Sequence, residues 1–90
     1  MKNKKVIVNR WDVIRIDWVD ACASGGWQDL EGITIKPFHV TSIGMFLGED
    51  DLHWTICTND GYSYNRVSDT MSIPKGMITY VEVIKRAKED

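Results

Sequence analysis

The sequence predicts a small all-β domain, a strongly bent five-stranded barrel. Short runs in which apolar and polar residues alternate recur along the chain, and this period of two is typical of strands with one buried face. Turn-forming residues separate the runs, and no stretch keeps a convincing helical spacing. Ninety residues are enough for one domain with a modest core. We expect this domain over residues 11–84, after a basic arm or short strand over 1–10 and before a charged tail over 85–90.

The first strand is predicted over Trp11–Val19. Ile14 and Ile16 fall on one alternating face and Arg15 and Asp17 on the other, so one face is expected in the core and the other in water.

A loop of about a dozen residues follows, from Asp20 to Gly32, and its length exceeds the usual connection of about 4–6 residues. Loops of this kind often carry function. Trp27 lies at its far end, where the indole either packs the loop back on the barrel or contacts a ligand.

The middle of the chain predicts a long strand, a turn and a return strand. Ile33–Leu47 reads as one strand, with Pro37 near its start and Gly44 where the backbone can bend. A turn at 49–51 leads to a return strand from Leu52, and Asn59–Gly61 carries a strong second turn signal. Residues 62–68 are a loop or a ragged strand, and another strand follows over 69–73.

The closing hairpin is expected to turn at Pro74–Gly76, because proline presets φ and glycine accepts positive φ. Its last strand is apolar on both alternating faces, which predicts that a second copy of the chain covers one of them. The predicted oligomer interface consists of Ile78, Tyr80, Ile84 and Met71. A short helix over Val83–Lys88 remains an alternative for the end of this strand.

Composition and charge exclude several classes of protein. The formal net charge is -2, but residues 11–83 alone carry four basic and eleven acidic side chains, which argues against a surface coated with phosphate contacts. Lys2, Lys4 and Lys5 form a basic start that would attract nucleic acid electrostatically. No apolar stretch is long enough to span a membrane or to act as a signal peptide, and two widely spaced cysteines suit a reducing compartment, so we expect a cytoplasmic protein.

Two motifs resemble the two-part signature of Sm-like proteins. Gly44 to Trp54 keeps that family's glycine, apolar position and aspartate at matching spacing, with Trp54 where the family has a base-contacting asparagine. Lys75-Gly76-Met77-Ile78-Thr79-Tyr80-Val81 follows the second part. Pro74 before the lysine is more similar to the turn ahead of the last strand in SH3-type barrels. The arrangement also resembles small uncharacterised proteins encoded by bacteriophages.

The resemblance implies an SH3/Sm-like barrel, assembled into a homo-oligomeric ring in which the fourth strand of one subunit pairs with the fifth of the next. It also implies that His53, Trp54, Lys75 and Gly76 approach a nucleobase. Trp54 continues the alternation of Leu52 and Ile56, so it either packs in the core or faces the ligand. The resemblance implies RNA as the single-stranded nucleic acid, and without the asparagine its binding is expected to have low sequence specificity.

Catalytic and metal chemistry find little support in the residue pattern. Cys22, His39, His53 and Cys57 lack the close pairs of a zinc site, and nothing in the sequence pairs Cys22 with a base. We therefore expect no enzyme, metal, cofactor or small-molecule substrate. The leading hypothesis is a non-enzymatic Sm-like ring that binds single-stranded nucleic acid, and the alternative is an SH3-like protein-interaction or phage assembly module that touches no nucleic acid.

Overall fold

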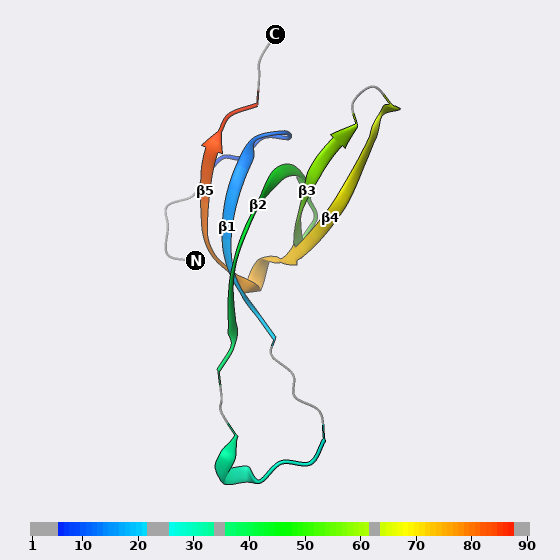
Figure 1. Ribbon diagram of the computed structural model, residues 1–90. Helices are drawn as coiled ribbons and strands as arrows, with labels where there is room; N and C mark the ends of the chain where they lie inside the picture. Colours follow the sequence, from blue (N-terminus) through cyan, green and yellow to red (C-terminus); the bar gives the residue numbers. More distant parts are fainter. Residues whose placement is uncertain (1–5, 22–25, 34–35, 62–63, 88–90) are drawn as a thin grey trace.

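The computed structural model describes residues 6–21, 26–33, 36–61 and 64–87. They form one sheet of five strands (Figure 1): β1 (Val13–Asp20), β2 (Phe38–Glu49), β3 (His53–Gly61), β4 (Arg66–Pro74) and β5 (Ile78–Lys85). Two single 3-10 turns, η1 (Leu30–Gly32) and η3 (Lys75–Met77), precede β2 and β5. Among the described residues there is no helix long and apolar enough to cross a membrane. The alternative helix at the end of the chain is wrong, because β5 continues through Lys85.

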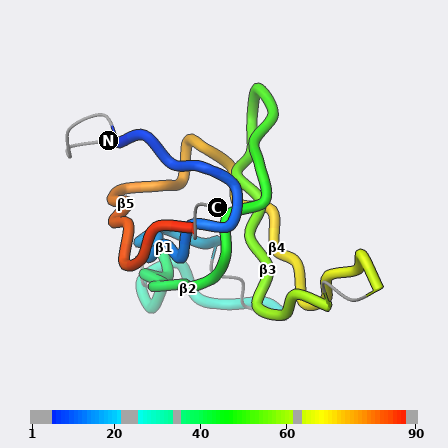
Figure 2. The backbone as a smooth tube through the Cα atoms, turned by 90° about the horizontal axis from the view of Figure 1, so that it is seen from above, coloured from blue at the N-terminus to red at the C-terminus, as the bar shows by residue number. Residues whose placement is uncertain are grey.

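The strands lie in the order β4-β3-β2-β1-β5, and every neighbouring pair is antiparallel. The prediction of an all-β fold is confirmed, but the prediction of a closed barrel is wrong. Within the described residues β4 pairs only with β3 and β5 only with β1, so both are edge strands. The sheet still curls, with β5, β1 and β2 on one side and β3 and β4 on the other (Figure 2).

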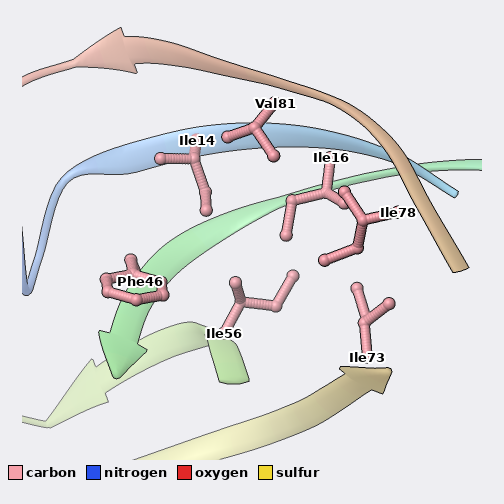
Figure 3. Close-up of a cluster of buried hydrophobic side chains, with 7 residues drawn as sticks. All are labelled: Ile14, Ile16, Phe46, Ile56, Ile73, Ile78 and Val81. Atoms are coloured by element: carbon pink, nitrogen blue, oxygen red, sulfur yellow. The ribbon is translucent and has the colours of Figure 1, made fainter. Parts of the chain in front are cut away.

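The core fills the inside of this curl (Figure 3). Ile73 of β4 and Ile78 of β5 both point into it, so the two edge strands meet through side chains rather than through backbone hydrogen bonds. The predicted alternation of β1 is confirmed, since Ile14 and Ile16 are fully buried and Arg15 is not. The buried cluster consists of Ile14, Ile16, Phe46, Ile56, Ile73, Ile78 and Val81.

Gly44 lets β2 approach β3 closely. A Cβ atom at this position would lie 2.8 Å from the backbone oxygen of Cys57, which is closer than real Cβ atoms come. The predicted strand through this glycine exists, but it begins at Phe38, one residue after Pro37, and runs to Glu49. Proline lacks the N–H that a strand needs for pairing, which explains the later start.

The second turn lies later in the chain than its sequence signal at Asn59–Gly61 predicts. Asn59–Gly61 stays within β3, where Asp60 pairs with Val67 and Gly61 with Arg66. The chain reverses between Gly61 and Arg66, and Asn65 has the positive φ of 54° that the turn requires. Residues 62 and 63 lie outside the described residues.

The two faces of β5 also differ from the prediction. Tyr80 pairs with Asp17 and Ile78 with Trp18, so Thr79 is an extra residue that forms a β-bulge. The bulge shifts the alternation by one, and Ile78 and Val81 therefore both face the core. Tyr80 and Ile84 remain exposed.

A buried carboxylate joins the two ends of the described chain. Asp12 accepts hydrogen bonds from the backbone N–H groups of Asn9 (2.9 Å) and Ala87 (2.6 Å) and from Nη1 of Arg86 (3.0 Å). The N–H of Asn9, followed by those of Ala87 and Arg86, holds the pKa of Asp12 below its ordinary value despite burial. We call these four residues the Asp12 clasp. The predicted strand near the N-terminus is absent from residues 6–10, where Val8 packs against the core.

Candidate functional site

The residues that the resemblance assigned to nucleic-acid binding come together where the β2–β3 turn meets η3. His53 pairs with Pro74 across β3 and β4, and the N–H of Lys75 donates to the backbone oxygen of Leu52 at 2.7 Å. Gly76 follows within η3 and is exposed. Glu49, Asp50, His53 and Lys75 form what we call the turn cluster.

Both basic groups of the turn cluster already have a carboxylate partner. Nζ of Lys75 lies 2.7 Å from Oε1 of Glu49, and Nδ1 of His53 lies 3.3 Å from Oδ1 of Asp50. The backbone N–H groups of Leu52 and His53 also donate to Asp50 and lower the pKa of its carboxyl. Asp51 adds a further acidic residue to this turn. At neutral pH the cluster is therefore acidic, and it does not favour a phosphate.

Trp54 lies at the border of the core. Its ring centroid is 5.0 Å from that of Phe46, with the planes tilted by 58°, and the side chain packs against the buried cluster. This contact matches the packing alternative for the indole. Trp54 is only partly buried, so some of its surface still reaches solvent.

The other predicted residues are distributed differently. Met71, Tyr80 and Ile84 are exposed, whereas Ile78 is 5% exposed within the core and has no surface for an interface. Lys2, Lys4 and Lys5 lie outside the described residues, as does Cys22. Among the described residues no group of three metal-ligating side chains gathers. Cys57 is buried, and burial raises the pKa of its thiol.

The connection between β1 and β2 extends away from the sheet (Figure 1). We call the connecting residues 21–37, together with Phe38 at the start of β2, the β1–β2 arm, of which 21, 26–33 and 36–38 are described. Four large apolar side chains of the arm are exposed: Trp27 (103%), Leu30 (85%), Phe38 (61%) and Ile33 (44%). Of the two alternatives for Trp27, the one in which its indole packs the loop back on the barrel is wrong, because the side chain is fully exposed. The hydrogen bonds of η1 are local, from Gly32 to Asp29 and from Ile33 to Leu30, and they turn the chain without bringing it to the core.

Polar contacts between β1 and β2 hold the base of this arm. Asp17 accepts hydrogen bonds from Nε of Arg15 (3.0 Å) and from the hydroxyl of Thr41 (2.8 Å). The Arg15 guanidinium, and then Thr41, lower the pKa of Asp17. The indole of Trp18 donates to the hydroxyl of Ser42 at 3.0 Å. The arm therefore projects from a well-bonded pair of strands.

Comparison with known protein families, with curated proteins and with solved structures found no match. Sequence reasoning singled out the long loop and Trp27 but missed Leu30, Ile33 and Phe38 as surface residues. The available signal was a loop rich in turn residues that also carries several large apolar ones.

Proposed function

We propose that the protein is a non-enzymatic interaction module, an SH3-like or Sm-like β domain that binds a protein partner through its β1–β2 arm. The observation that carries the proposal is the exposure of Trp27, Leu30, Ile33 and Phe38 on that arm. The η3 turn ahead of β5 supports the likeness to SH3-type domains, since Pro74 and Lys75 begin it as the resemblance implies.

Exposed apolar side chains on a projecting loop favour binding rather than folding. Transferring apolar surface out of water is favourable, and a side chain such as Trp27 gains none of this energy in the free protein. Tryptophan also leads the residues that dominate binding energy at protein interfaces. A partner with an apolar groove would bury the arm and gain that free energy.

A photo-crosslinking amino acid placed at Trp27 tests this proposal. In cells that make the protein, we expect a discrete adduct with one partner, because the side chain is fully exposed on the arm. The matched control carries the same group at Tyr64, an exposed aromatic residue beyond the end of β3. The proposal fails if Trp27 gives no adduct, or gives the same adducts as Tyr64.

Self-association is the second part of the proposal. Within the part of the chain that the structure describes, β4 and β5 each leave one edge unpaired, and uncovered edges tend to pair with another chain. Pairing β4 of one copy with β5 of the next would continue the sheet head to tail and could close a ring. Met71, Tyr80 and Ile84 lie exposed on these two strands.

Light scattering measures this assembly directly. We expect a mass several times the 10.3 kDa of one chain, and a return to one chain's mass in Tyr80→Asp/Ile84→Asp, which places two charges on β5. Thr58→Asp, an exposed change on β3, is the control and should leave the assembly intact. A wild-type monomer at all accessible concentrations would contradict edge pairing.

Binding of single-stranded nucleic acid at the turn cluster is the second candidate function. It is favoured by the proximity of His53, Trp54 and Lys75, and opposed by the carboxylates of Glu49 and Asp50. If it operates, fluorescence anisotropy with labelled oligo-U should show salt-sensitive binding that Lys75→Ala abolishes. Glu49→Gln should strengthen it, because the lysine is then free for phosphate. Equal affinities in both variants would remove this candidate.

A further inference from the structure

A surface cavity of about 420 Å³ lies between the N-terminal segment, the end of β2 and the β3–β4 hairpin. Its position is distinct from the turn cluster, which sits at the first residue of β3, whereas the cavity reaches the last residues of that strand. The lining residues are Arg10, Trp11, Leu47, Asp60, Asn65, Arg66 and Val67.

Trp11 is held in an unusual backbone conformation at this cavity. Its φ is 76°, in the left-handed region that bulky residues rarely adopt. Its N–H donates to the backbone oxygen of Phe46 at 2.7 Å, and the next residue is the buried Asp12. The contacts on both sides fix the strained residue, and strain of this kind is concentrated at functional sites. Trp11 is 37% exposed, and its indole N–H, unlike its backbone N–H, has no partner among the described residues.

Two arginines, Arg10 and Arg66, line the cavity together with Trp11. Nε of Arg10 donates to the backbone oxygen of Leu47 at 2.8 Å, which orients this side chain while its other nitrogens remain available. Arg66 pairs with Gly61 through its backbone, and its side chain forms no hydrogen bond or ion pair with the described part of the chain. Among the described residues that line the cavity, Asp60 is the only acidic one, so with Arg10 and Arg66 they carry a net positive charge on a largely acidic protein.

We propose that this cavity binds a nucleoside monophosphate unit, with the base against the Trp11 indole and the phosphate between Arg10 and Arg66. An aromatic ring stacks on any base, and guanidinium groups bind phosphate through paired hydrogen bonds. The unit can be a free nucleotide or one residue of a single-stranded nucleic acid. This site does not depend on the β1–β2 arm or on the turn cluster.

The carboxylate of Asp60 gives the site a base preference. It accepts hydrogen bonds from the exocyclic amino groups of adenine, cytosine or guanine, and uracil has no such group. A second hollow of about 370 Å³ shares Asp60, Arg66 and Val67 with the first. It offers room beside the same arginine for a neighbouring nucleotide.

Nuclear magnetic resonance of the 15N-labelled protein tests the site. The Trp11 indole N–H resonance, assigned with Trp11→Phe, should shift on titration with AMP, and shift less with UMP. Adenosine and inorganic phosphate should each shift it far less than AMP. The Trp18 indole, which is bonded to Ser42, is the internal control and should not move.

Arg66→Gln should weaken AMP binding at least about tenfold, while Lys36→Gln, which removes the same charge from an exposed position elsewhere, should not. Both residues are exposed, so both variants should keep the dispersed spectrum of the folded protein. A labelled (A)6 RNA distinguishes the source: tighter binding than AMP indicates nucleic acid, and weaker binding a free nucleotide.

The proposal is overturned if neither AMP nor (A)6 moves the Trp11 indole, or if Arg66→Gln and Lys36→Gln bind alike. It is also overturned if inorganic phosphate produces the full shift, because the site would then recognise an anion without a base.

Discussion

Ile14, Ile16 and Ile73 of the sheet are entirely buried, whereas Trp27 and Leu30 of the β1–β2 arm expose most of their surface. Each buried isoleucine contributes on the order of 1.5–3 kcal/mol to folding. The arm residues contribute little of that kind, although they are as apolar. The comparison shows that this small chain divides its apolar side chains between a buried region that stabilises the fold and an exposed region, the one that we propose binds a partner.

In the sheet region a large effect is expected from the Asp12 clasp. Asp12→Asn should lower the free energy of unfolding by about 3 kcal/mol, because the amide cannot accept from all three donors and leaves Arg86 without its counter-charge. Urea unfolding measures the loss. Asp20→Asn, an exposed change at the end of β1, is the control, and an equal loss in both variants would contradict the role of the clasp.

The same carboxylate predicts a pH dependence. The pKa of Asp12 is lower in the folded protein than in the unfolded chain, so its contribution is complete above pH 3.8 and is lost as the pH falls through the folded value. Acid should therefore destabilise the wild type more than Asp12→Asn. Asp17 and Asp50 titrate in the same direction, so part of the acid effect should remain in the variant.

Glycine substitutions compare the two regions at a smaller scale. Gly44→Ala should cost about 2 kcal/mol, because its Cβ would meet the Cys57 backbone oxygen at 2.8 Å and backbone can yield only by moving β2 from β3. At Gly32 in the arm, an added Cβ atom would have no neighbour within 4 Å among the described residues. Gly32→Ala should therefore change the free energy of unfolding by less than about 0.5 kcal/mol. Thermal unfolding of the two variants measures the difference, and a loss of stability in Gly32→Ala as large as that in Gly44→Ala would contradict this account.

The turn cluster should have the smallest effect on the fold. Lys75→Ala removes a half-exposed ion pair with Glu49, and such pairs contribute about 0–1 kcal/mol. The loss should shrink further in high salt. A decrease of more than about 2 kcal/mol in the free energy of unfolding in urea would show that Lys75 stabilises the fold by more than its ion pair with Glu49.

The sequence predicts the strands better than their connections. The alternation of Ile14 and Ile16 locates β1 because a period of two has one physical cause, burial of one face. The turn signal at Asn59–Gly61 misleads because Asp60 and Gly61 still find partners on β4. The bulge at Thr79 is set by pairing with β1, so no local pattern reveals it.

The candidate sites were predictable only in part. Lys75 and His53 were expected to lie near each other, and they do, but the carboxylates that pair with them come from the folded turn. Arg10 and Arg66 line the same cavity although they are far apart in the chain, and a single sequence cannot indicate such proximity. Leu30 and Phe38 are exposed because the arm points away from the sheet, and no periodic pattern in the loop sequence predicts the direction of the arm.

The most direct test compares unfolding of Trp27→Ser/Leu30→Ser with that of Ile16→Ala in urea. The single core change should cost about 2–5 kcal/mol, whereas the double arm change should leave the free energy of unfolding within about 0.5 kcal/mol of wild type. With the photo-crosslinking amino acid in place of Trp27, the further change Leu30→Ser should weaken the expected partner adduct, because it removes a second exposed apolar side chain of the arm. An arm variant as unstable as the core variant would mean that these side chains fold the protein, and would contradict their assignment to a partner.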